Sequence, residues 1–97
     1  MEIIKNRNGD ELVLEVVDRL DTLTAPDLEK VVREELGGVK ELVFDFSKLI
    51  YISSAGLRII VRIKQKYDDT SLINTPSGVY DIFKMVGFHN MIKIEKL

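Results

Sequence analysis

The chain has 97 residues, of which 45% are hydrophobic, so it can supply the core of one compact domain but not of two. Its net charge of -2 and its pI near 5.4 argue against a nucleic-acid-binding module, because such modules usually carry a basic excess on one face. It contains no cysteine and a single histidine, His89, which excludes disulfides, thiolate metal sites and histidine-rich metal clusters; no metal or cofactor is expected.

The first expected element is a hairpin. Residues 1–6 read as a short strand, and Asn8-Gly9 is the dipeptide that most readily adopts the positive φ angles of a tight turn. Residues 11–17 then alternate in hydropathy, which predicts a half-buried second strand. Its more apolar face carries Leu12, Leu14 and Val16.

A helix is predicted after a loop over residues 18–24. Apolar residues recur there at spacings of three and four, as an amphipathic helix requires. They are Ala25, Leu28, Val31, Val32 and Leu36. Thr24 with Asp27 resembles a capping box at the start of this helix, and Gly37-Gly38 is expected to end it.

The next strand is predicted over residues 42–46, with Leu42, Phe44 and Phe46 on one face and Asp45 on the other. Residues 46–52 read as a connection. A second helix follows from Ser54 to about Lys66, and its charged face carries Arg58, Arg62 and Lys66. That face is expected to be solvated or, because it lies next to Ser54, to meet an acidic partner.

The last third of the chain is expected to hold a short strand, a helix and a final strand. Residues 70–74 can hold only a short strand, and Thr75-Pro76-Ser77-Gly78 opens a third helix that Gly87 stops. The core positions of this helix are Val79, Ile82, Phe83 and Val86. Residues 91–95 form the final strand.

Strands that alternate with helices in this order build parallel βαβ units with right-handed crossovers. The sequence therefore predicts one α/β domain over residues 1–97, with a mostly parallel sheet of about five strands and an N-terminal antiparallel hairpin. Because several strands alternate in hydropathy, the three helices are expected to cover mainly one face of the sheet.

No apolar run approaches the roughly 20 residues that cross a bilayer, so no membrane insertion is expected. Residues 1–5 also lack a signal-peptide core, and the cytoplasm is the expected compartment.

The most informative stretch runs from Asp45 to Leu57, because it reads as a strand, a loop and a helix N-terminus. The first turn of a helix presents backbone N–H groups without intrahelical partners, and the macrodipole adds partial positive charge there. Ser53 and Ser54 can cap this helix, and a phosphate on one of them would sit where negative charge is well tolerated.

Enzymatic alternatives have little support in the sequence. Ser54 lacks the Gly-x-Ser-x-Gly elbow of a serine hydrolase, and there is no phosphate-cradling Gly-x-x-x-x-Gly-Lys loop. Asp21 and Asp45 could be imagined as paired carboxylates, but nothing else indicates a substrate. The sequence therefore predicts a protein that is not an enzyme, and a small hydrolase using Ser54 ranks last.

At residues 45–57 the chain resembles the STAS domain, in particular the stand-alone bacterial anti-sigma-factor antagonists. The signature of that family runs Asp-x-Ser, a short apolar stretch, and then Asp/Ser/Thr-Ser-Ser/Ala-Gly-Leu. Its matching positions here are Asp45, Ser47, Ser54, Gly56 and Leu57. The upstream residues 19–25 also look like the family's loop between its second strand and first helix, so the resemblance covers essentially the whole chain.

The resemblance implies a role in partner switching. In that family, the serine at the position of Ser54 is phosphorylated by a kinase that is itself the anti-sigma factor, and a serine phosphatase is a further implied partner. Ser53 stands where many members have aspartate and is the less favoured acceptor. The residues expected to bind the partner kinase are Asp21, Thr22, Thr24, Ser53, Ala55, Gly56, Arg58 and Arg62.

Other interpretations of the same residues stay open. Asp21 could position the kinase or its nucleotide, or it could simply make a turn. Asp45 and Ser47 are expected to orient the loop, and Asp18 stands where relatives often have glycine. STAS-like domains also serve transporters and signalling assemblies, so an accessory subunit or a small-ligand sensor is the alternative function.

Overall fold

The structure, a computed structural model, describes residues 2–35 and 37–97, so the predicted strand residue Met1 and the predicted core residue Leu36 lie outside the described part. The strands are β1 (Glu2–Asn8), β2 (Glu11–Leu20), β3 (Glu41–Asp45), β4 (Leu49–Ile52), β5 (Thr70–Thr75) and β6 (Lys93–Lys96). The helices are α1 (Ala25–Glu35), α2 (Ser54–Lys66) and α3 (Ser77–Met85), followed by a 3-10 turn, η1 (Phe88–Asn90).

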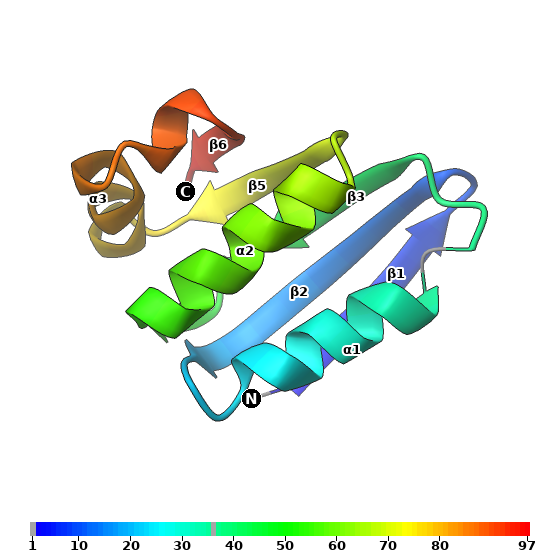
Figure 1. The fold of residues 1–97 in the computed structure, drawn as a ribbon, viewed down its shortest axis with the longest axis horizontal. Coiled ribbons are helices and arrows are strands. Elements are labelled where there is room, and N and C mark those ends of the chain that lie inside the picture. Colours follow the sequence, from blue (N-terminus) through cyan, green and yellow to red (C-terminus); the bar gives the residue numbers. More distant parts are fainter. Residues whose placement is uncertain (1, 36) are drawn as a thin grey trace.

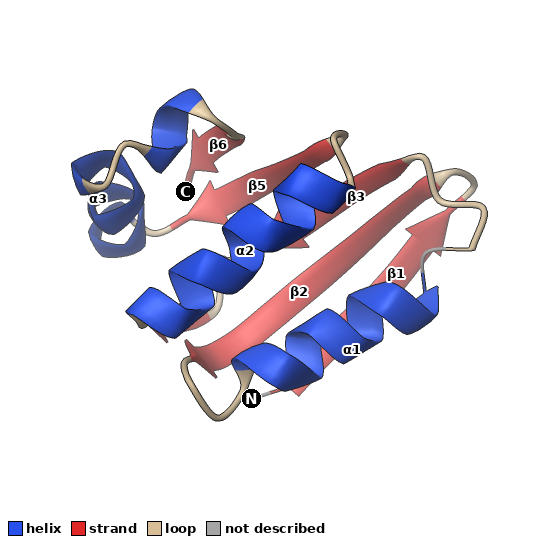
Figure 2. Cartoon of the chain, viewed as in Figure 1, coloured by secondary structure: helices blue, strands red, loops and turns tan. Residues whose placement is uncertain are grey.

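The strands form one mostly parallel sheet in the order β1-β2-β3-β5-β6. β1 is antiparallel to β2, whereas β2 with β3, β3 with β5 and β5 with β6 are parallel. Helices α1 and α2 lie side by side across one face, and α3 lies beyond the end of β5 (Figure 1, Figure 2). The predicted α/β class, the N-terminal hairpin and the one-sided helix layer are confirmed.

Strand β4 was not predicted, because residues 49–52 were read as connection. It pairs in parallel with the last residues of β2, with Arg19 opposite Tyr51 and Leu20 opposite Ile52. Strand β4 fills the place beside the end of β2. Because β2 has ten residues and β3 only five, the last residues of β2 would otherwise lack a hydrogen-bonding neighbour on that side. A register shift at Asp18, whose φ is +78°, separates the two halves of β2.

The core lies between the sheet and the helix layer. β2 contributes Leu12, Leu14 and Val16, and these predicted inward positions are buried. Phe46 stacks at 6.1 Å, centroid to centroid, on Phe44. It also stacks at 6.5 Å on Phe83 of α3, which joins the third helix to the sheet.

Three local predictions are wrong. The hairpin turn is centred on Gly9 and Asp10 rather than on Asn8 and Gly9, because Asn8 already pairs with Glu11. Val86 is 48% exposed and not a core residue, because α3 ends one residue earlier, at Met85. The hydroxyl of Thr24 is used within the preceding loop, so the capping box with Asp27 does not form as predicted.

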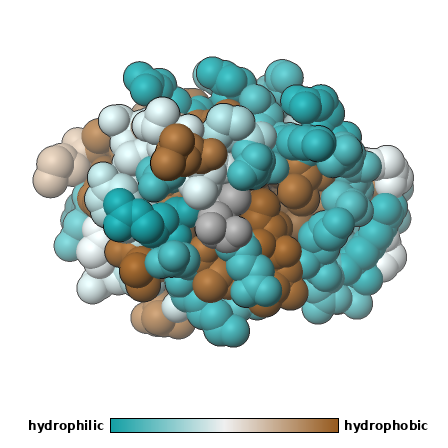
Figure 3. All heavy atoms as spheres, turned by 90° about the horizontal axis from the view of Figure 1, so that it is seen from below, coloured by the Kyte–Doolittle hydropathy of each residue, from teal (hydrophilic) through white to brown (hydrophobic). Residues whose placement is uncertain are grey.

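On the side of the molecule seen in Figure 3, hydrophilic groups surround apolar patches. Across residues 2–35 and 37–97, no helix combines the length and the hydropathy that crossing a membrane requires.

Candidate functional site

The candidate site lies where β2 and β4 end and α2 begins. The Ser53 N–H donates to the Leu20 carbonyl at 2.9 Å, which ties the start of α2 to the end of β2. The loop that follows Leu20 therefore lies next to the first turn of α2. Two segments around Asp21 and Ser54, which are 33 residues apart in the sequence, meet at the carboxyl edge of the sheet.

The two adjacent serines have different environments. Ser53 is the N-cap of α2: it is half-buried, with extended backbone, and its Oγ accepts a hydrogen bond of 3.3 Å from the Gly56 N–H. Ser54 is the first helical residue and is exposed. No hydrogen bond to its side-chain hydroxyl is present among residues 2–35 and 37–97. Capping therefore occupies the hydroxyl of Ser53 and leaves that of Ser54 accessible.

Gly56 is buried against the end of β2. A Cβ at this position would lie 2.6 Å from the Leu20 carbonyl oxygen and 2.8 Å from Cγ1 of Ile52. The glycine therefore allows a close approach of α2 to the sheet, and it is buried rather than facing solvent. Gly56 can affect partner binding only by holding the neighbouring residues of α2 in position. Ala55 is half-buried beside it.

Asp21 organises the neighbouring loop. Its Oδ1 accepts hydrogen bonds from the backbone N–H groups of Leu23, at 3.0 Å, and Thr24, at 3.2 Å. Burial alone would raise the pKa of this carboxyl, but these two bonds, with the Thr24 hydroxyl and Arg19, outweigh burial and hold the pKa below its usual value. The carboxylate therefore makes the turn, which was one of the two interpretations of this residue.

Thr24 closes the same loop. Its hydroxyl accepts a 2.8 Å hydrogen bond from the Asp21 N–H and donates a 3.1 Å bond to the Arg19 carbonyl. Between these residues, Thr22 and Leu23 project outward, and Leu23 is 85% exposed. The internal bonds hold the loop in a shape that presents its tip to solvent.

Asp45 and Ser47 form a second turn at the end of β3. The Ser47 N–H donates to Asp45 Oδ1 at 2.9 Å. This contact agrees with the structural role expected for Asp45, whereas Ser47 takes part through its backbone N–H and not through its side chain.

Arg19 and Tyr51 were not recognised as site residues from the sequence. The Arg19 guanidinium carbon lies 4.4 Å from the centroid of the Tyr51 ring, and its Nε is 3.4 Å from Asp21 Oδ2. Ile50, next to Tyr51, is 72% exposed. The available signal was the apolar run Leu49 to Ile52 directly before two serines, which is unusual for a solvent-facing connection.

The two predicted arginines of α2 are not equivalent. Arg58 is exposed one turn after Ser54. Arg62 is also exposed, but its Nη1 lies 3.3 Å from Glu29 Oε2 on α1. Arg62 therefore joins the two helices as well as facing solvent.

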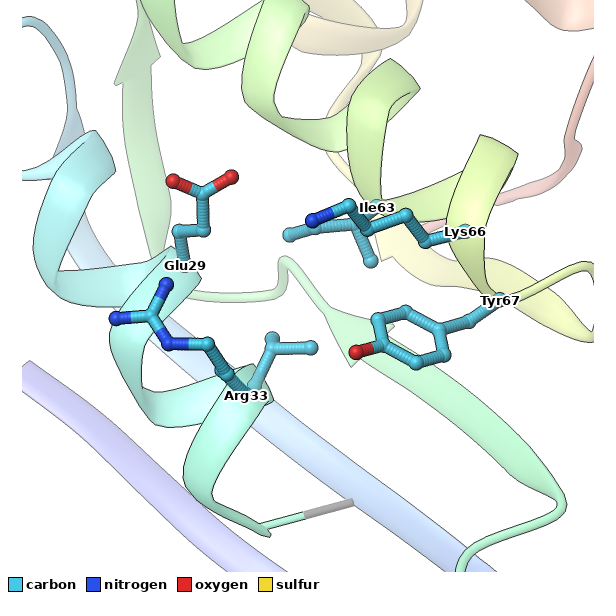
Figure 4. A pocket seen from close by; sticks show the side chains of 6 residues that line it. Glu29, Arg33, Ile63, Lys66 and Tyr67 are labelled. Carbon is cyan, nitrogen blue, oxygen red and sulfur yellow. The ribbon is translucent and has the colours of Figure 1, made fainter.

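A small hollow lies between the far ends of α1 and α2. Figure 4 shows the Tyr67 ring directed across the hollow toward α1, with Glu29, Arg33, Ile63 and Lys66 also lining it. Its volume of about 20 Å³ is enough for roughly one water molecule. Because α2 has 13 residues, this hollow is about 20 Å from Ser54 and is separate from the candidate site.

The family model of the STAS domain matches residues 2–96. No curated protein matches the sequence. Among solved structures, an anti-sigma factor antagonist from Mycobacterium paratuberculosis is similar at 18% identity and a TM-score of 0.87, with 99% of this chain and 86% of that chain covered.

Two further solved structures widen the comparison. The Bacillus cell-fate determinant SpoIIAA in its phosphorylated form is similar at 14% identity and a TM-score of 0.74, with 96% of this chain and 90% of that chain covered. The murine anion transporter Slc26a9 is similar at 13% identity and a TM-score of 0.74, over 88% of this chain but only 15% of the transporter. At these identities the likeness shows the shared fold.

Proposed function

Because the chain belongs to the STAS domain family, we propose that it acts as an anti-sigma-factor antagonist in a partner switch. In its unphosphorylated form it binds an anti-sigma factor that has serine kinase activity, and a sigma factor is thereby released for transcription. Phosphorylation of Ser54 ends that binding, and a serine phosphatase restores it. These steps take place in the cytoplasm, where transcription occurs in bacteria.

The observation that carries this proposal is the accessible hydroxyl of Ser54 at the start of α2. A kinase must bring the γ-phosphate of ATP in line with the hydroxyl, so the acceptor has to be exposed and free of strong internal bonds. Ser54 meets both conditions, whereas Ser53 holds the cap of α2. Ser54 is therefore the proposed acceptor and Ser53 the weaker candidate.

The phosphate would change binding through charge rather than through refolding. It adds about -1.5 to -2 charges at neutral pH. The first turn of α2 contains no acidic residue, so the helix dipole stabilises the added charge and the fold is kept. A partner surface that fits the neutral hydroxyl would instead meet desolvation cost and repulsion.

The proposed docking surface surrounds Ser54. The exposed tip of the upstream loop contributes Thr22, while Asp21 and Thr24 hold its shape. From α2, Arg58 and Arg62 offer positive charge to an acidic partner, with Ala55 between them and the cap.

The acceptor can be identified by incubating the protein with ATP and the candidate kinase from the same genome, followed by mass spectrometry. We expect one phosphate on the wild type and on Ser53→Ala, and none on Ser54→Ala. Ser53→Ala is the matched control, because it removes the adjacent hydroxyl. Labelling of Ser54→Ala at the wild-type rate, or no labelling of the wild type, would refute the proposal.

The effect of the charge can be measured separately by calorimetry. Ser54→Asp is expected to keep the circular dichroism spectrum of the wild type but to bind the kinase at least about tenfold more weakly, which corresponds to roughly 1.4 kcal/mol. Equal affinities of Ser54→Asp and wild type would contradict an electrostatic switch.

A second candidate function is an accessory domain of a transporter or signalling assembly, or a small-ligand sensor. The similarity to Slc26a9 favours the accessory role, since there the fold makes up only 15% of a much longer chain. Co-purification with a transport protein from the same genome, without any kinase, would favour this alternative. A shift of melting temperature with metabolites or nucleotides would favour the sensor.

A further inference from the structure

An open groove runs between β4 and α3. One wall consists of the strand itself, Leu49–Ile52, and the other includes Pro76, Val79 and Ile82 at the start of α3. Its volume is about 570 Å³, and its lining is mainly apolar. We call it the β4–α3 groove. Because β4 leads directly into Ser53 and Ser54, the groove reaches the rim of the candidate site.

The strand that forms one wall has a free edge. Among residues 2–35 and 37–97, β4 pairs only with β2. The Ser53 N–H points toward β2, where it meets the Leu20 carbonyl at 2.9 Å. Backbone groups of alternate residues point to opposite edges of a strand, so Ile52 and Ile50 direct theirs away from β2. These unpaired groups face the groove and can pair with another strand.

The side chains along this edge are also unusual for a free surface. Ile50 and Leu97 both line the groove, and each is 72% exposed. Isolated exposed apolar residues are common, but here two of them border one hollow with an unpaired strand. Apolar side chains at alternate positions of an incoming strand would cover both.

The α3 end of the groove carries partial positive charge. The N-cap of α3 is Pro76, no side chain caps its first turn, and that turn contains no acidic residue. Gly78, in the same turn, lines the groove. The free N–H groups of the turn would therefore attract a carboxylate that lies in the groove.

We propose that the β4–α3 groove binds an extended segment of the anti-sigma partner, which adds a strand to the free edge of β4. The segment carries apolar side chains at alternate positions and an Asp or Glu carboxylate that reaches the first turn of α3. This inference rests on the proposed function for the identity of the partner. To the proposed function it adds a mode of recognition: beside Ser54, the partner is bound through main-chain hydrogen bonds and apolar contacts.

A second copy of this chain fits the groove less well. Its free strand edges belong to β1, β4 and β6. β4 carries no carboxylate, and β1 and β6 each carry two basic residues and one acidic residue. None of these strands would bring net negative charge to the positive end of α3. The charge of the site therefore favours a partner with an acidic segment.

The groove is tested with the purified kinase and three variants, by calorimetry. Ile50→Lys is expected to weaken binding at least tenfold. Met85→Lys is the matched control, because Met85 is 83% exposed on the same helix and is not among the residues that line the groove; its affinity should stay within twofold of the wild type. Gly78→Glu should raise the melting temperature yet weaken binding at least threefold, because the added carboxylate competes with that of the partner.

Amide hydrogen exchange measured by NMR separates strand addition from simple apolar contact. The amides of Ile50 and Ile52 should exchange at least tenfold more slowly in the complex than in the free protein. Unchanged exchange, or an Ile50→Lys variant that binds like the wild type, overturns the groove proposal. If Ser54→Asp still weakens binding in that case, the partner switch stands without it.

Two other results would also overturn the groove proposal. If light scattering shows that the wild type is a dimer and Ile50→Lys a monomer with unchanged kinase affinity, the occupant is a second copy. If no complex with the kinase forms at all, both the partner switch and the groove proposal fail.

Discussion

Replacing Gly56 by alanine tests how closely α2 approaches the sheet. The new Cβ would lie 2.6 Å from the backbone oxygen of Leu20, about 0.8 Å short of the 3.4 Å at which ordinary contact begins. A backbone oxygen cannot rotate away as a side chain can, so α2 or the end of β2 must shift. Such overpacking typically costs about 1–3 kcal/mol.

Gly78 in α3 provides a matched control, since it also lies in the first turn of a helix. A Cβ there would have no atom within 4 Å. Replacing a helical glycine by alanine stabilises by roughly 0.5–1 kcal/mol, through the lower entropy of the unfolded chain. Gly78→Ala should therefore be more stable by about that amount, whereas Gly56→Ala should be less stable by about 0.5–2 kcal/mol.

Urea unfolding measures both changes, and unchanged m-values would show that the two-state comparison is valid. In a thermal scan, each kcal/mol should appear as a shift of about 4–8 °C for a domain of this size. Equal stabilisation by the two substitutions would refute the close approach of α2 to Leu20.

Three further predictions concern the same region. Ser53→Ala should lower the free energy of unfolding by about 0.5–2 kcal/mol, because the Gly56 N–H loses its hydrogen-bond acceptor. Ser54→Ala should change the free energy of unfolding by less than about 0.5 kcal/mol. Urea unfolding of the two variants checks both values. Asp18→Val should destabilise by about 1–2 kcal/mol, because a β-branched residue is strained at a φ of +78°, while Asp18→Gly should not destabilise; the same assay applies. The pKa of Asp21 in the folded protein lies below its usual value of 3.8. The ionised carboxylate therefore stabilises the fold fully above pH 3.8, and this stabilisation is lost as the pH falls through the folded-state pKa. The stability difference between wild type and Asp21→Asn should therefore be constant near neutral pH and shrink below pH 3.8, and a constant difference down to pH 2 would contradict the hydrogen-bonded turn.

Long elements with regular spacing could be predicted from the sequence. Helix α2 begins at Ser54 and ends at Lys66, as its apolar spacing indicates. The hydroxyl residues at its start mark the N-terminus, because such residues accept hydrogen bonds from free N–H groups. The order of strands and helices was enough to predict a parallel sheet with one antiparallel hairpin.

Features that depend on tertiary neighbours could not be predicted in the same way. Strand β4 has four residues and no alternation of burial, and it is a strand only because the end of β2 lies beside it. The sequence also allowed either serine to cap α2; the backbone of Ser53 decides, since it is extended and hydrogen-bonded to Leu20.

The candidate site was predicted in its position but not in its internal contacts. Asp21 was recognised, but its role in the turn follows from the bonds that it accepts from Leu23 and Thr24. The stacking of Arg19 on Tyr51 could not be foreseen, because the two residues become neighbours only through the pairing of β2 with the unpredicted β4.

The ten residues of β2 have a practical consequence for studying this protein. At about 3.3 Å per residue the strand is roughly 33 Å long, so the hairpin turn at one end and Ser54 at the other are separated by most of the molecule (Figure 1). Gly9 lies in that turn, and no atom lies within 4 Å of where its side chain would be. A fluorescent reporter or an affinity peptide inserted between Gly9 and Asp10 would therefore stand clear of any protein bound at Ser54.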